Sequence, residues 1–164
     1  MFLVKKLGVF ILLLWCSFGV QAHGFDYSVM RFTETENRTW DLTITSSLDA
    51  FRKEVRLHFS DTPYATPEQF NEQLLAHINK TLTLSAKTKQ ITLVEGKVSL
   101  GHETSVVFKN ITFAKNTQKI TLTNGAVKDI YRHTTKLIVT PLSSDKQSFI
   151  LNKSNDFTAN IPVQ

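Results

Sequence analysis

The sequence has a single cysteine, six glycines and four prolines, and no block of like charges in its 164 residues. So few glycines and prolines exclude a collagen-like or low-complexity chain, and 41% hydrophobic residues exclude a disordered one. Lysines are scattered from Lys53 to Lys153 without a run of five or six, so nucleic-acid binding is not expected. The length predicts one domain of ordinary size.

The first 22 residues have the pattern of a secretory signal peptide. Lys5 and Lys6 precede an apolar run from Leu7 to Trp15, and Val20 to Ala22 form a small-residue cleavage motif. The apolar span of about 15 residues is shorter than the roughly 20 that a membrane-spanning helix needs. We therefore expect cleavage between Ala22 and His23, a periplasmic or secreted bacterial protein, and no membrane span after the signal is removed.

Removal of residues 1–22 leaves a single β-rich domain, residues 23–164, without cysteine, because Cys16 leaves with the signal. Trp15 stands where a lipoprotein signal needs a small residue, so lipid attachment at Cys16 is not expected. Disulfides, thiol catalysis and thiolate metal sites are thereby excluded from the mature chain. The net charge falls from +5 to +3, because the signal carries two lysines and no acidic residue. This mild positive charge is compatible with contact to an anionic envelope polymer.

Alternating apolar and polar residues predict strands through most of the mature chain, which also holds 20 Thr, 9 Val and 9 Ile. Trp40, Leu42 and Ile44 would share one face of a strand. The same spacing of two recurs in Val55/Leu57/Phe59, Leu82/Leu84, Ile91/Leu93, Val98/Leu100, Val106/Phe108, Ile120/Leu122, Leu137/Val139 and Phe149/Leu151. Together with a turn at Asn124-Gly125, the pattern predicts a mainly β protein, an antiparallel, Ig-like β-sandwich.

One amphipathic helix is predicted within this pattern, near residues 67–79. Thr66, Pro67 and Gln69 supply an N-cap, a proline at the first helical position and the third residue of a capping box. Apolar residues then recur at a spacing of four, at Phe70, Leu74 and Ile78. Short helical turns are also expected at residues 48–54 and 126–132.

No motif indicates catalysis. The sequence lacks a Gly-x-Ser-x-Gly nucleophile elbow, a His-Glu-x-x-His zinc helix and a glycine-rich phosphate loop. Asp129 and His133 could meet at a spacing of four in a helix, and Gly101-His102-Glu103 places a base beside an acid, but neither pair has a third group in reach. His58 and His77 are interpreted as surface residues. We therefore predict no catalytic residue.

His23 is the one candidate metal ligand, because signal cleavage makes it the amino terminus. Its α-amine and imidazole can then bind one ion as neutral nitrogen donors. A third nitrogen from His58, His102 or His133 would complete a T-shaped copper site. In His23 and Gly24 the chain resembles some copper-dependent polysaccharide oxygenases and periplasmic copper carriers, whose mature chains also begin with histidine.

Across nearly the whole mature chain, the order of features resembles an uncharacterised family of small exported bacterial proteins. The shared features are strands at 23–32 and 40–49, a middle helix before Leu82-Thr83-Leu84, Leu122 to Gly125, Asp129 to Tyr131, a strand at 136–139 and Ser148 to Leu151. The chain departs from the family pattern at Ser47 to Ala50 and at Thr134-Thr135. The resemblance implies export and an approximate fold, and it implies no activity.

Two hypotheses about function follow. The first is a non-catalytic envelope module that binds a partner protein or surface polymer through loops or an edge strand. Among the loops, Asp61 to Thr66 and the turn at Asn124 are the best-placed segments. The second is a copper-binding or copper-dependent protein that uses His23. We favour the first, because catalysis requires convergent groups and the candidate acids, bases and ligands are dispersed along the chain.

The signal peptide gives the first prediction. Protein recovered from an envelope fraction should have the mass of residues 23–164 and begin with His23, because the cleavage motif ends at Ala22. Intact-mass spectrometry measures this directly. A mature mass that still includes residues 1–22 would contradict the prediction.

Overall fold

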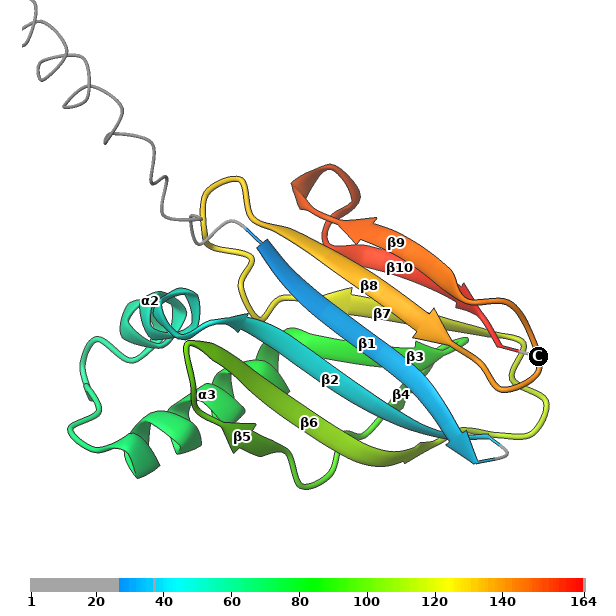
Figure 1. Cartoon of the computed structure of the whole chain (residues 1–164), viewed down its shortest axis with the longest axis horizontal. Coiled ribbons are helices and arrows are strands. Elements are labelled where there is room, and N and C mark those ends of the chain that lie inside the picture. Colours follow the sequence, from blue (N-terminus) through cyan, green and yellow to red (C-terminus); the bar gives the residue numbers. More distant parts are fainter. Residues whose placement is uncertain (1–26, 37, 164) are drawn as a thin grey trace, which may run out of the picture.

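The computed structural model describes residues 27–36 and 38–163, so the expected signal peptide and His23 lie outside the described residues. Two β-sheets pack together, and two helices lie beside each other at one end of them (Figure 1). The mainly β sandwich is thereby confirmed. None of the helices in the described part of the chain is long and apolar enough to cross a membrane.

The elements keep the labels of Figure 1. In chain order they are β1 (Tyr27–Glu36), β2 (Thr39–Ser47), α2 (Leu48–His58), α3 (Pro67–Thr81), β3 (Leu82–Ala86), β4 (Lys89–Ile91), β5 (Lys97–Ser99), β6 (Glu103–Thr112), β7 (Lys119–Asn124), β8 (Thr134–Thr140), β9 (Gln147–Leu151), a 3₁₀ turn (Lys153–Asn155) and β10 (Thr158–Pro162).

The first sheet has the strand order β5-β6-β2-β1-β8-β9, and the second has the order β10-β7-β3-β4. One pair in the described part departs from the antiparallel prediction: β1 and β8 run parallel, from Tyr27 opposite Thr134 to Thr33 opposite Thr140. The reason is the path of the chain. β7 belongs to the second sheet, so residues 125–133 carry the chain across to the first sheet, and β8 enters beside β1 without a hairpin.

In β2, β6, β7 and β8 the core forms as the alternation predicted, whereas Leu93 and Leu100 lie outside the strands and Leu100 is 42% exposed. In β2, Trp40, Leu42 and Ile44 are buried, whereas the residues between them are only half-buried. The Trp40 ring stacks on Phe32 of β1 with centroids 4.5 Å apart. Buried residues of both sheets and both helices join in one apolar cluster, so a single core holds the helices against the sandwich.

Helix α3 confirms the helix expected near residues 67–79 and extends it to Thr81. The Thr66 hydroxyl accepts a hydrogen bond from the Gln69 amide at 3.3 Å, as an N-cap should. Its apolar stripe is buried against the core, and its members are Phe70, Leu74 and Ile78.

Residues 55–59 correct the strand prediction, because helix α2 runs through most of them, to His58. The Ser47 hydroxyl caps the helix by accepting a hydrogen bond from the Ala50 amide at 3.1 Å. Phe51 and Val55 are then buried four residues apart, while Leu57 remains 59% exposed. The cap and the spacing of four decided the local structure, and the alternation that suggested a strand was too short to prevail.

Residues 126–132 form consecutive turns instead of the expected helical turn. The amides of Lys128 and Ile130 donate to carbonyl oxygens three residues earlier, at 3.5 and 3.4 Å. Arg132 then adopts a left-handed φ of 59°. Bonds that close after three residues and end in this conformation cannot start an α-helical ladder.

The alternation in β2 gives a mutational test. Leu42→Asp should unfold the domain, because it buries an unpaired charge in the core. Thr43→Asp should change the free energy of unfolding by no more than about 1 kcal/mol, because Thr43 lies on the other face opposite the exposed Arg31. Urea denaturation followed by circular dichroism measures both. Equal tolerance of the two substitutions would refute the assignment of faces.

Candidate functional site

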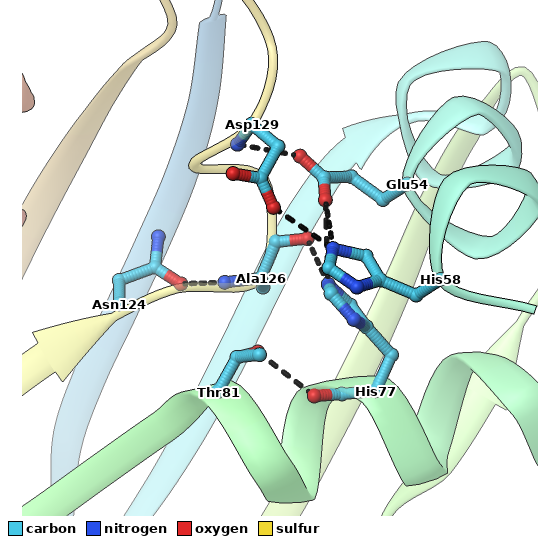
Figure 2. Close-up of polar contacts among 7 residues, drawn as sticks. All are labelled: Glu54, His58, His77, Thr81, Asn124, Ala126 and Asp129. Carbon is cyan, nitrogen blue, oxygen red and sulfur yellow. Dashed lines mark hydrogen bonds and ion pairs between the residues drawn. The ribbon is translucent and has the colours of Figure 1, made fainter.

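Two helices and the turn segment, residues 125–133 between β7 and β8, bring four titratable side chains together (Figure 2). Glu54 and His58 come from α2, His77 from α3, and Asp129 from the turns between β7 and β8. Glu54 Oε2 lies 3.5 Å from His58 Nε2 and 3.5 Å from His77 Nε2. His58 Nε2 lies 2.8 Å from Asp129 Oδ2. We call these four residues the histidine–carboxylate cluster.

Local structure explains why these side chains converge. Glu54 and His58 are four residues apart in α2, so they project from the same side of the helix. His77 follows Leu74 by three residues on the buried face of α3. Each helix therefore directs its part of the cluster toward the turn segment that contains Asp129.

Gly125 allows the turn segment to approach α3 this closely. Its amide donates a hydrogen bond to the Thr81 carbonyl oxygen at 3.0 Å. A Cβ at this position would lie 2.6 Å from that oxygen and 2.8 Å from the Thr81 Cβ, so a side chain would force the segments apart. Asn124 holds the next residue of the turn segment, because its side-chain oxygen accepts a hydrogen bond from the Ala126 amide at 3.2 Å.

The cluster has a buried half and an exposed half. The side chains of Glu54 and His77 are 0% and 1% exposed, whereas those of His58 and Asp129 are 34% and 36% exposed. Glu54 Oε1 accepts a hydrogen bond from the Asp129 amide at 3.0 Å. Its Oε2 is buried and accepts no hydrogen bond from the residues that the structure describes. A buried carboxylate oxygen without a hydrogen bond is costly and calls for an explanation.

Burial changes the pKa values of the two inner residues in opposite directions. Loss of solvation raises the pKa of Glu54 to about 7, although the Asp129 amide opposes the rise. Loss of solvation, aided by the nearby His58, lowers the pKa of His77 to about 4. At neutral pH His77 is therefore an uncharged imidazole, and Glu54 readily gives up its proton.

Hydrogen bonds fix how both imidazoles are oriented. His77 Nε2 donates to the Ala126 carbonyl oxygen at 3.1 Å, since a carbonyl can only accept. His58 Nε2 donates to the Asp129 carboxylate. The two rings pack with their centroids 4.6 Å apart and their planes 32° from parallel. Both Nε2 atoms consequently face the same small space beside Glu54 Oε2 (Figure 2).

This arrangement has the composition of a metal site. Potential ligand atoms of Glu54, His58 and His77 all lie within 4.8 Å of one another. Zinc held tetrahedrally at about 2.0–2.1 Å places neighbouring donors about 3.3 Å apart, close to the two separations of 3.5 Å seen here. Imidazole and carboxylate donors suit Zn²⁺ and similar divalent transition metals.

The other sequence candidates lie elsewhere. His133 does not meet Asp129: its Nε2 is 3.0 Å from Ser28 Oγ, in a buried polar network with Thr135. That network fastens the start of β1 to the start of β8. His102 is exposed just ahead of β6. Of the three suggested partners for His23, only His58 therefore belongs to the cluster.

The cluster was not predicted from the sequence, because the buried His77 was interpreted as a surface residue, like His58, which is exposed. His77 is 2% exposed, and its place one residue before the buried Ile78 on the apolar face of α3 was the available signal. The Glu54–His58 spacing of four was hidden by assigning Val55 to a strand. Nothing in the sequence placed Asp129 beside α2.

The opposed pKa shifts predict a pH dependence that single substitutions separate. With Glu54→Gln, His77 is the inner residue that still titrates. Its contribution to the free energy of unfolding is full above its unfolded pKa of 6.5 and is lost as pH falls toward its folded pKa of about 4. With His77→Gln, Glu54 is the inner residue that still titrates. Its contribution to the free energy of unfolding is full below its unfolded pKa of 4.5 and is lost as pH rises toward its folded pKa of about 7. Each loss should be about 3 kcal/mol.

Urea denaturation of the metal-free variants from pH 4 to 7.5 measures these slopes. The double variant Glu54→Gln/His77→Gln serves as the reference for all other titrating groups. In the wild type the two slopes oppose each other and nearly cancel between pH 4.5 and 6.5. Single variants with slopes of the same sign would contradict the assignment.

Comparison with models of known protein families gives no match, and comparison with curated protein sequences gives none either. Function is therefore inferred from the geometry and chemistry of the histidine–carboxylate cluster.

Proposed function

We propose that this chain is an exported, non-catalytic β-sandwich module that binds one divalent transition-metal ion, of the Zn²⁺ class, at the histidine–carboxylate cluster. The observation that carries the proposal is Glu54 Oε2: this buried carboxylate oxygen accepts no hydrogen bond from the described residues, and it faces two imidazole nitrogens at 3.5 Å. A bound cation would supply the missing partner.

The donor set favours a borderline ion over a hard one. Two imidazoles and a carboxylate match the ligands that proteins use for Zn²⁺, whereas Ca²⁺ and Mg²⁺ prefer oxygen alone. His77 is already uncharged at neutral pH, because burial lowers its pKa to about 4. If His77 binds through Nε2, the Ala126 carbonyl oxygen, 3.1 Å from that nitrogen, becomes available as a further oxygen donor.

A binding role fits the surroundings of the cluster better than catalysis does. Catalysis by a zinc ion needs a coordination position left to water or substrate. Here Glu54, His58 and His77 offer three donors, and the Asp129 carboxylate, 2.8 Å from His58 Nε2, lies next to them and can fill the fourth position. The Ser28 hydroxyl, bonded to His133, is 1% exposed and out of a substrate's reach.

Export remains a prediction from the first 22 residues, and copper binding at His23 remains a prediction about residues outside the described part. No observation in the described part favours the copper site over the cluster. The two sites are separable by experiment, because an N-terminal site needs a free α-amine and the cluster does not.

Calorimetric titration of metal-free protein with Zn²⁺ should give one site per chain. Glu54→Gln and His77→Gln should each weaken binding by at least about tenfold, equivalent to about 1.4 kcal/mol, because each removes a donor from a buried set. Matched controls are Glu72→Gln and His102→Gln, which change exposed residues outside the cluster and should bind as the wild type does.

A second pair of proteins tests the position of the ion. Residues 23–164 with and without a methionine ahead of His23 should bind Zn²⁺ equally, since the cluster does not involve the amino terminus. Wild-type protein that binds no Zn²⁺, or that loses binding only when His23 is blocked, would overturn the proposed function.

A further inference from the structure

The exposed half of the cluster defines how an ion could enter and leave. Among the four described residues of the cluster, the side chains of Glu54 and His77 are buried, and those of His58 and Asp129 are about one third exposed. The exposed side of the cluster is thus formed by these two outer residues, which are joined to each other at 2.8 Å, and an ion can reach the inner pair from that side (Figure 2).

The His58–Asp129 hydrogen bond competes directly with metal binding. An ion that binds His58 Nε2 must replace the proton through which that nitrogen donates to Asp129 Oδ2. Once the bond is broken, Asp129 Oδ2, which lay 2.8 Å from His58 Nε2, can turn toward the same ion as a donor. Loss of the His58–Asp129 hydrogen bond lowers the affinity for the ion. The new bond from the Asp129 carboxylate to the ion restores part of that affinity.

The backbone of Asp129 stays in place without the ion. Its amide donates to Glu54 Oε1 at 3.0 Å, while the other oxygen of the same carboxylate remains available to the ion. The residues just before Asp129 are also held, by the hydrogen bond from the Gly125 amide to Thr81 and by that from the Ala126 amide to Asn124. The Asp129 side chain can therefore change partner while the turn segment keeps its position.

The fold itself does not depend on the ion. The apolar cluster runs continuously through both sheets and both helices, so no ion is needed to hold the elements together. This differs from small domains in which a structural zinc ion supplies the folding energy and cannot leave without unfolding.

We infer that the cluster is a carrier site that exchanges its ion with an acceptor, and that Asp129 controls the exchange: it bonds His58 in the metal-free protein and becomes the fourth ligand in the loaded one. This inference rests on the proposed function. The acceptor is any site of higher affinity for the same ion, and a chelator can represent it.

The test uses the full mature chain loaded with Zn²⁺ and mixed with the colorimetric chelator 4-(2-pyridylazo)resorcinol. The dissociation rate follows from stopped-flow absorbance, the Kd from equilibrium competition, and the association rate from their combination. The wild type should release its ion within seconds to minutes while circular dichroism stays unchanged. Retention until the protein unfolds would overturn the carrier role without touching the proposed function.

Two variants separate the roles of Asp129. Asp129→Ala removes both the fourth ligand and the hydrogen-bond acceptor, so the dissociation and association rates should both rise, the former by about tenfold. Asp129→Asn retains an oxygen that can accept from His58, so only the dissociation rate should rise. Asp145→Ala, an exposed aspartate in the loop before β9, is the matched control and should change neither rate.

Co²⁺ substitution provides a spectroscopic signal that would not change if Asp129 had a purely structural role. The wild type should give the strong visible absorption of four-coordinate Co²⁺, and Asp129→Ala should weaken and shift it as water replaces the carboxylate. The role of Asp129 is overturned if both variants exchange Zn²⁺ within twofold of the wild-type rates and leave the Co²⁺ spectrum unchanged. Absence of any Zn²⁺ binding by the wild type would instead overturn the proposed function.

Discussion

The buried carboxylate of Glu54 is the interaction on which the arrangement of helices and turns depends. One of its oxygens accepts the Asp129 amide and so fastens the segment between β7 and β8 to α2. The other faces His58 of its own helix and His77 of α3. Other hydrogen bonds join the same segments: His58–Asp129 links α2 to the turn segment, and His77–Ala126 and Gly125–Thr81 link α3 to it.

Such a group is expensive to bury, and its surroundings offset only part of the cost. Removal of a carboxylate from water raises its pKa, which for Glu54 reaches about 7. One backbone hydrogen bond and two imidazoles at 3.5 Å are modest compensation. A site that already contains a partly unsatisfied acid and an uncharged histidine needs little rearrangement to receive a cation.

The rest of the molecule supplies a rigid frame for this site. β1 is paired on both sides, antiparallel with β2 and parallel with β8, so the strands that lead into α2 and out of the turn segment are held in one sheet. The Ser28–Thr135 hydrogen bond, at 2.7 Å, reinforces the parallel pair at its start. Strand pairing therefore brings α2 and the turn segment near each other, and the contacts of Glu54 then join them at the site.

The sequence by itself determined the sandwich and helix α3. Alternation in β2, β6, β7 and β8 is a local property that a strand needs in order to bury one face. The Thr66 cap and the apolar spacing in α3 are equally local. Helix α2 was missed beyond its first turns, because three alternating apolar residues imitate a strand when the Ser47 cap is not given enough weight.

Only the tertiary structure decided the site and the parallel pair. Glu54 and Asp129 are separated by 75 positions, and their contact depends on the chain crossing from the second sheet to the first between β7 and β8. No local pattern records which sheet a strand will join. The chemistry of His58 and His77 follows from that crossing too, because burial and the carboxylates around an imidazole, and not its neighbours in sequence, decide whether it is a surface residue or a candidate metal ligand.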